Sequence, residues 1–200
     1  MIDALSSQWQ AQTWQELVAF VLSIAYVILA ARQNIWCWAC ALLSTGLYSY
    51  VFYAVSLPFQ SALNLYYIVM AIIGFLGWQK ATQNNHLILR KLSFLNHLVI
   101  ISTGLLSTLF LLWLGEQWFS SDYLLLDAWV TIFSIIATIL TARRYIDNWY
   151  YWMVINSAAI YLFVMTNLLL TALLMMIYTI VAVYGVMNWH RSLAVQSANT

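Results

Sequence analysis

The chain has 200 residues, of which 64% are hydrophobic and only 6% charged, and its net charge at pH 7 is +1. Soluble domains carry about 25% charged residues, and a soluble protein of this size could not cover so much apolar surface. The expected solvent is therefore a lipid bilayer, and the near-neutral charge makes nucleic acid an unexpected partner.

Seven apolar segments follow one another along the chain, each close to the length of about 20 residues that a helix needs to cross a bilayer. Their apolar residues do not alternate with period two, which excludes the strands of a membrane β-barrel. The sequence predicts an all-α integral membrane protein with seven transmembrane helices, at 15–31, 35–54, 59–78, 94–114, 122–142, 149–166 and 168–189.

The basic residues test this count of seven. All of them fall in the loops after spans one, three, five and seven, which share one side of the membrane, whereas five of the six acidic residues fall on the other. Because basic loops stay cytoplasmic, we expect the N-terminus outside and the C-terminus in the cytoplasm. The basic residues are Arg32, Lys80, Arg90, Lys91, Arg143, Arg144 and Arg191, and the five acidic ones are Asp3, Glu16, Glu116, Asp122 and Asp127.

The first three spans resemble the last three. Four pairs of similar residues lie 111 positions apart, and Trp38 is matched to Trp152 at a distance of 114, which requires three inserted residues that are later removed. Such internal similarity indicates a duplicated bundle. We predict a 3+1+3 arrangement of parallel repeats, with bundles at 15–78 and 122–189 and a linker helix at 94–114; transporters of this kind bind substrate between the repeats. The four pairs are Glu16 with Asp127, Tyr67 with Tyr178, Gly74 with Gly185, and Trp78 with Trp189.

Several motifs carry a resemblance to a known family. "NIWCW" at 34–38, "ARRYIDNWYYW" at 142–152 and the final pattern Tyr178, Gly185, Trp189 resemble the PnuC family of bacterial vitamin transporters, from about Trp14 to Arg191. The resemblance implies a SWEET-like fold in the bacterial inner membrane, a homotrimer, and facilitated diffusion of a B vitamin. A cytoplasmic enzyme would trap the vitamin by phosphorylation.

Two positions depart from the pattern of the nicotinamide riboside transporters in this family. Thr138 stands where that pattern has Gln, and Asn156 stands where it has Asp. Since Gln and Asp suit ribose hydroxyls and thiamine has no ribose, the departures favour thiamine, the substrate of the related PnuT proteins. Nicotinamide riboside is the alternative.

The candidate substrate-binding residues lie on helix faces that mix aromatic, amide and small side chains. Trp38 and Trp152 could stack on a flat cationic ring, Tyr48 and Tyr178 could add a hydroxyl beside it, and Asn64 and Asn156 serve either the substrate or helix packing. Gly74 and Gly185 are expected to serve packing. The full candidate set is Trp38, Tyr48, Asn64, Tyr67, Thr138, Trp152, Asn156 and Tyr178, with Glu16 and Asp127 as an acidic pair that either caps helix N-termini or attracts a cation.

Other functions find little support in the sequence. No catalytic motif or deep carboxylate pair indicates an intramembrane enzyme, and no cofactor or metal is expected. Cys37 and Cys40 lie one turn apart in an apolar run and are expected to pack. The absence of a Walker A motif and of acids at midplane argues against ATP or proton drive. A receptor that does not transport is the remaining rival.

Overall fold

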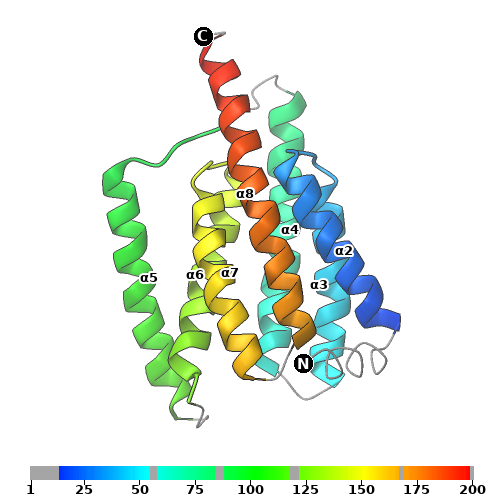
Figure 1. Cartoon of the computed structure of the whole chain (residues 1–200), viewed down its shortest axis with the longest axis vertical. Helices are drawn as coiled ribbons and strands as arrows, with labels where there is room; N and C mark the ends of the chain where they lie inside the picture. Colours follow the sequence, from blue (N-terminus) through cyan, green and yellow to red (C-terminus); the bar gives the residue numbers. More distant parts are fainter. Residues whose placement is uncertain (1–13, 55–57, 84–87, 118–121, 167–168, 199–200) are drawn as a thin grey trace.

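The computed structural model describes residues 14–54, 58–83, 88–117, 122–166 and 169–198, which form seven α-helices (Figure 1). Asp3 and Leu168, which the sequence analysis included, lie outside these ranges. The helices are α2 (Trp14–Ala31), α3 (Cys37–Ala54), α4 (Pro58–Gln83), α5 (Phe94–Gly115), α6 (Leu124–Ala142), α7 (Asn148–Met165) and α8 (Leu169–Ala198).

Each predicted span coincides with one helix to within a few residues, except at the ends of α4 and α8. These two helices continue several residues past Trp78 and Trp189, because the polar residues that follow are good helix formers and include neither Pro nor Gly. Within the described residues, four helices are both long and apolar enough to cross a membrane: α2, α5, α6 and α8.

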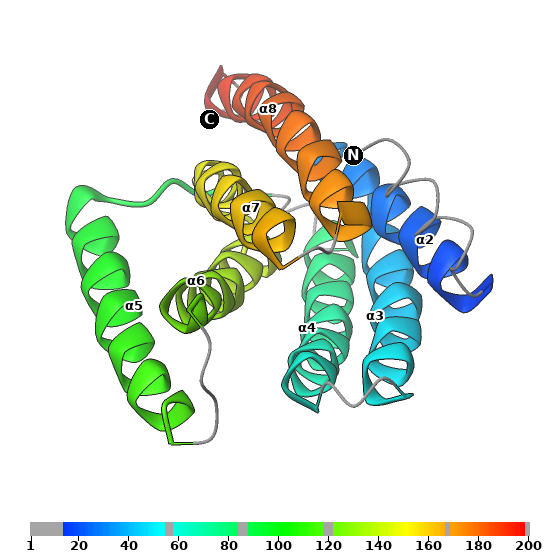
Figure 2. The same ribbon diagram turned by 60° about the horizontal axis from the view of Figure 1, so that its bottom comes forward.

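Six helices form a closed ring, and α5 stands beside it. Around the ring, α2 packs on α3, α3 on α4, α4 on α6, α6 on α7, α7 on α8, and α8 on α2. Helix α5 packs on α6 and touches α7 through the stacked pair of His97 and Tyr151, and Figure 2 shows it to one side of the others. The ring therefore has two seams between its halves, α2 with α8 and α4 with α6.

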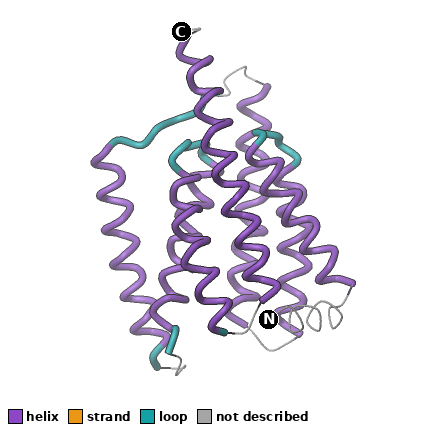
Figure 3. The backbone as a smooth tube through the Cα atoms, in the orientation of Figure 1, coloured by secondary structure: helices purple, strands orange, loops and turns teal. Residues whose placement is uncertain are grey.

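The turns after α2 and α6 have the same backbone conformation, and both lie at the upper end of the molecule in Figure 3. Gln33 and Arg144, 111 positions apart, both have a positive φ, 56° and 59°. In the first turn the amides of Gln33 and Asn34 donate to the carbonyls of Ala30 and Leu29, and the second turn repeats both bonds at the equivalent positions. This is a Schellman motif, which satisfies the last carbonyls of each helix.

The structure corrects the matching of Trp38 to Trp152. The ring of Trp38 lies against Gly74, and the ring of Trp149 lies against Gly185, so that a Cβ atom at either glycine would overlap the indole. Trp38 therefore corresponds to Trp149, with the same spacing in the chain as the other pairs, and no insertion is needed. The prediction that both glycines serve packing is confirmed.

Four buried tryptophans form a chain of ring contacts at this end of the bundle, and its central pair joins the two halves. Trp38 meets Trp78 edge-on with ring centroids 5.6 Å apart, Trp78 lies 6.1 Å from Trp189, and Trp189 meets Trp149 edge-on at 5.5 Å. The Nε1 atom of Trp78 donates to the carbonyl of Ala142, and that of Trp189 donates to the carbonyl of Ala30. Each half thus donates one indole hydrogen bond to the other; these residues are called the tryptophan seam below.

A strap at 88–93 joins the end of α4 to α5 and pairs with the turn after α6. The amide of Arg90 donates to the carbonyl of Arg144, and the carbonyl of Arg90 accepts from the amide of Ile146. The buried carboxylate of Asp147 accepts from the amide of Leu92 at 2.7 Å. The strap thus fixes where α5 begins relative to α6.

Candidate functional site

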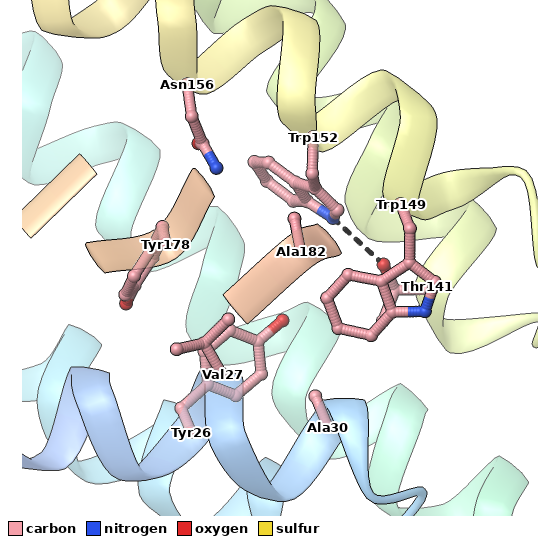
Figure 4. Close-up of a pocket in the computed structure, with 9 residues that line it drawn as sticks. All are labelled: Tyr26, Val27, Ala30, Thr141, Trp149, Trp152, Asn156, Tyr178 and Ala182. Atoms are coloured by element: carbon pink, nitrogen blue, oxygen red, sulfur yellow. Dashed lines mark hydrogen bonds between the residues drawn. The ribbon is translucent and has the colours of Figure 1, made fainter. Parts of the chain in front are cut away.

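A small cavity lies inside the ring, between α2, α6, α7 and α8 (Figure 4). Its volume is about 30 Å³, room for one or two water molecules. Aromatic rings and one amide form most of its wall, and none of its lining residues is charged. The lining residues are Tyr26, Val27, Ala30, Thr141, Trp149, Trp152, Asn156, Tyr178 and Ala182.

Trp152 and Asn156 enter the cavity from one face of α7, because residues four apart lie one above the other on a helix. The indole Nε1 of Trp152 donates to the hydroxyl of Thr141 on α6 at 3.1 Å, the bond drawn in Figure 4. That hydroxyl lies 3.0 Å from the side-chain oxygen of Asn148, whose amide donates in turn to the carbonyl of Tyr145. Asn148 is fully buried, so this chain of bonds holds the indole plane in place.

A cluster of tyrosines lies beside the cavity. Tyr178 on α8 donates to the backbone carbonyl of Ser23 on α2 at 3.1 Å, and Tyr67 on α4 forms a side-chain hydrogen bond with Ser134 on α6. These two bonds occupy equivalent positions in the two repeats, and each links one half of the ring to the other. Tyr26 and Tyr48 lie close to Tyr178, so four phenols gather near the middle of the bundle.

The predicted site residues separate into two groups. Trp152, Asn156 and Tyr178 line the cavity together. Trp38 is 2% exposed and packs on Gly74, and the hydroxyl of Thr138 is bonded to the carbonyl of Ser134 in its own helix.

The remaining candidates lie near the cavity or at a helix start. Tyr48, Asn64 and Tyr67 do not line the cavity, although Tyr48 and Tyr67 belong to the tyrosine cluster. Glu16 and Asp127 lie in the first turns of α2 and α6, where a carboxylate is favoured by the helix dipole, and Glu16 interacts electrostatically with Tyr48.

Sequence reasoning missed three polar or aromatic residues of the cavity wall: Tyr26, Thr141 and Trp149. Tyr26 is the lone polar aromatic within the apolar run of α2, which is a usable signal. Trp149 was hidden because the second half has two tryptophans three residues apart, and the wrong one was matched to Trp38. Thr141 lies one turn after Thr138 on α6, and the sequence alone does not show which of the two reaches the cavity.

The cavity suits binding rather than chemical conversion. Faces of Trp and Tyr attract a flat ring, more strongly when the ring is cationic and away from water, and the Asn156 amide offers both a donor and an acceptor. The lining holds neither a nucleophile beside a base nor a pair of acids. The fold is that of a helical membrane protein, and the cavity wall is of a kind that suits a small ring-bearing molecule.

Comparison with known proteins identifies the family. Residues 13–191 match the family described as nicotinamide mononucleotide transporter, and the chain belongs to it. It is therefore a transporter and not an enzyme.

Two named relatives and one solved structure are similar along nearly the whole chain. The nicotinamide riboside transporter PnuC of Neisseria mucosa is 27% identical, over 94% of this chain and 76% of the relative. The protein of the same name from Escherichia coli is 23% identical, over 90% of this chain and 86% of the relative. The crystal structure of the vitamin B3 transporter PnuC aligns with a TM-score of 0.76 and 26% identity, and covers 96% of this chain and 87% of that one.

Proposed function

We propose that the protein carries nicotinamide riboside across the inner membrane by facilitated diffusion, with the ring held between Trp152 and the tyrosines. The observation that carries the proposal is the arrangement of Trp152 and Asn156 on the cavity wall of a chain whose relatives are named for this substrate. The ring would stack on the indole, and the Asn156 amide would bond to a polar group of the ligand. Phosphorylation in the cytoplasm would then prevent its return.

Thiamine is the second candidate, and Asn156 is the residue that favours it. The sequence argument for thiamine used both Thr138 and Asn156, but the Thr138 hydroxyl is bonded within α6 and lies off the cavity wall. Thr138 therefore no longer supports a choice between the two substrates. Asn156 still favours thiamine, because it lines the cavity at the position where the riboside pattern has an Asp suited to the ribose hydroxyls that thiamine lacks.

A binding comparison on the purified protein tests the substrate. We expect nicotinamide riboside to bind more tightly than thiamine in titration calorimetry, and a tenfold preference for thiamine would overturn this choice while leaving the transport class intact. Uptake into kinase-free proteoliposomes tests the mechanism. The internal concentration should level off at the external one, and accumulation above it under an imposed proton gradient would exclude facilitated diffusion.

The proposed transport cycle requires the two halves of the ring to separate at their seams. A cavity of about 30 Å³ is far smaller than the roughly 300–1,000 Å³ of ligand pockets, so the conformation described here is closed around the proposed site. In a 3+1+3 repeat, rocking of α2–α4 against α6–α8 would open one end at a time. The tryptophan seam would be the contact that parts toward the cytoplasm.

The orientation of the chain belongs to the same proposal. With seven spans, the one-sided placement of Lys and Arg supports an N-terminus outside and a tryptophan seam on the cytoplasmic side. Cysteines introduced at Gln117 and at Arg90, in a chain lacking Cys37 and Cys40, would report it. An impermeant outside reagent should label the first position and spare the second, and the reverse pattern would contradict the orientation. A homotrimer is also proposed, on the family resemblance alone.

A further inference from the structure

A second and larger cavity lies outside the ring, between α5 and α6. Its volume is about 360 Å³, within the range of about 300–1,000 Å³ found for ligand sites. Helix α5 forms one wall and α6 the other, with the strap and the turn after α6 at one end. The lining residues are Leu92, Asn96, Val99, Ile100, Ile136, Ile139, Leu140, Arg143 and Tyr145.

The cavity wall divides into an apolar part and a polar end. Val99, Ile100, Ile136, Ile139 and Leu140 line its length, and all lie within helices. The polar members lie at the end where the basic residues gather: Asn96 in the first turn of α5, Arg143 just after α6, and Tyr145 in the turn. This grading from an apolar length to a basic mouth is the shape of a site for an amphiphile with a negative head.

Arg143 is available to such a head group. Its side chain is exposed and forms no hydrogen bond or ion pair with the residues that the structure describes. No carboxylate lines the cavity, and the nearby Asp147 is buried and accepts the strap amide of Leu92. The neighbouring Arg144 points inward instead and donates to the carbonyl of Trp78 at 2.9 Å. Within the described part of the chain, the mouth therefore carries an uncompensated positive charge.

The outer wall of the cavity faces the membrane. Leu95 is 70% exposed and Val99 63%, and only 11% of the apolar stretch of α5 is buried. A lipid could therefore enter from the side. Basic pockets between transmembrane helices on the cytoplasmic side are known to hold anionic head groups.

We propose that this cavity binds one anionic phospholipid, with its phosphate at Arg143, Asn96 and Tyr145 and an acyl chain between α5 and α6. A second copy of the chain fits less well as the occupant. Oriented the same way in the membrane, it would present no free acid at this level, because the described acids other than Asp147 lie at the opposite helix ends. The bound lipid would fill the gap between α5 and the ring, on which α5 packs mainly through α6.

Native mass spectrometry of the full-length protein tests the proposal, with dioleoyl phosphatidylglycerol and dioleoyl phosphatidylcholine added in separate titrations. We expect Arg143→Gln to weaken phosphatidylglycerol binding about fivefold, from roughly 1 kcal/mol per basic residue near the head groups. Phosphatidylcholine binding should change less. Arg191→Gln is the matched control, since Arg191 is an exposed cation on α8 that does not line the cavity.

A second variant tests the apolar part of the cavity. Val99→Trp would fill it from the α5 side and should reduce the binding of both lipids, while Val183→Trp, on the exposed face of α8, should not. Equal losses in Arg143→Gln and Arg191→Gln would mean only general surface attraction and would overturn the site. A change in oligomeric mass with unchanged lipid binding in Val99→Trp would assign the cavity to a second copy instead.

Discussion

The two halves of the ring repeat several local features and differ in what they present to the cavity. Positive φ angles, Schellman bonds, tryptophan–glycine contacts and tyrosine–serine bonds recur at equivalent positions of the two repeats. The polar wall does not recur, because Thr141, Trp152 and Asn156 correspond to Ala30, Ala41 and Thr45. Shared residues build the scaffold and part of the cavity wall, such as Trp149 and Tyr178, and the residues that distinguish the halves add Thr141, Trp152 and Asn156 to that wall.

Substitution of the shared glycines should have the largest effect, and the effect should be similar in both halves. Gly74→Leu and Gly185→Leu each force a side chain into an indole ring, at a cost of about 1–3 kcal/mol from overpacking. The melting temperature of the purified protein in detergent measures the loss. Gly46→Leu is the control, since nothing lies near its added Cβ atom. Loss in one half only would contradict the equivalence of Trp38 and Trp149.

Among the unshared residues, substitutions in the second half should weaken substrate binding, and a substitution at an equivalent position of the first half should not. We expect Trp152→Ala and Asn156→Leu each to weaken substrate binding at least tenfold, which is about 1.4 kcal/mol. Thr45→Val, at the position equivalent to Asn156, should leave the affinity unchanged. Titration calorimetry with nicotinamide riboside and with thiamine checks both. Unchanged affinity in Trp152→Ala and Asn156→Leu would reject the cavity as the site.

Loss of the indole hydrogen bond from either half of the tryptophan seam should speed its opening by a similar amount. Trp78→Phe and Trp189→Phe each remove one indole hydrogen bond between the halves, worth about 1 kcal/mol. If the seam closes the cytoplasmic side, labelling of Ala182→Cys from that side should accelerate about fivefold in either variant. The background is a chain without Cys37 and Cys40. Faster labelling from the outer side would contradict a cytoplasmic position of the tryptophan seam.

The smallest expected effect concerns the bond that orients Trp152. Thr141→Val removes the acceptor of the indole Nε1 while keeping the side-chain shape, and we expect an affinity loss of about threefold, or roughly 0.7 kcal/mol. Thr141→Ser restores a hydroxyl and should recover most of it. Ala30→Ser, at the equivalent position in the first half, should give no gain. Equal losses in Thr141→Val and Thr141→Ser would point to packing rather than to the hydrogen bond.

The sequence predicted the helices well and the pairing of the halves less well. Long apolar segments locate helices because the bilayer fixes their length. The turns after α2 and α6 escaped notice because Gln33 and Arg144, and not glycine, occupy the positive-φ positions. Without those turns, Trp152 looked like the partner of Trp38.

The candidate site was predicted in part, for a reason of geometry. Periodicity identified the faces of α7 and α8 that turn inward, and Trp152, Asn156 and Tyr178 followed from it. It could not tell which inward residues reach a cavity and which pack on a neighbouring helix, as Trp38 does on Gly74. That distinction depends on helix separation, which a single sequence does not contain.

The hydrogen bonds of the tryptophan seam have a consequence for the origin of this architecture. Trp78 donates to α6 and Trp189 donates to α2, and the acceptors, Ala142 and Ala30, lie within one residue of equivalent positions. An interface in which each side offers the same donor to the same kind of acceptor is isologous, the type formed by two copies of one chain. A three-helix ancestor could have used these contacts to form a symmetric dimer. Joining two such copies end to end would leave the second inverted, and one further crossing of the membrane, the place held by α5, would restore its direction.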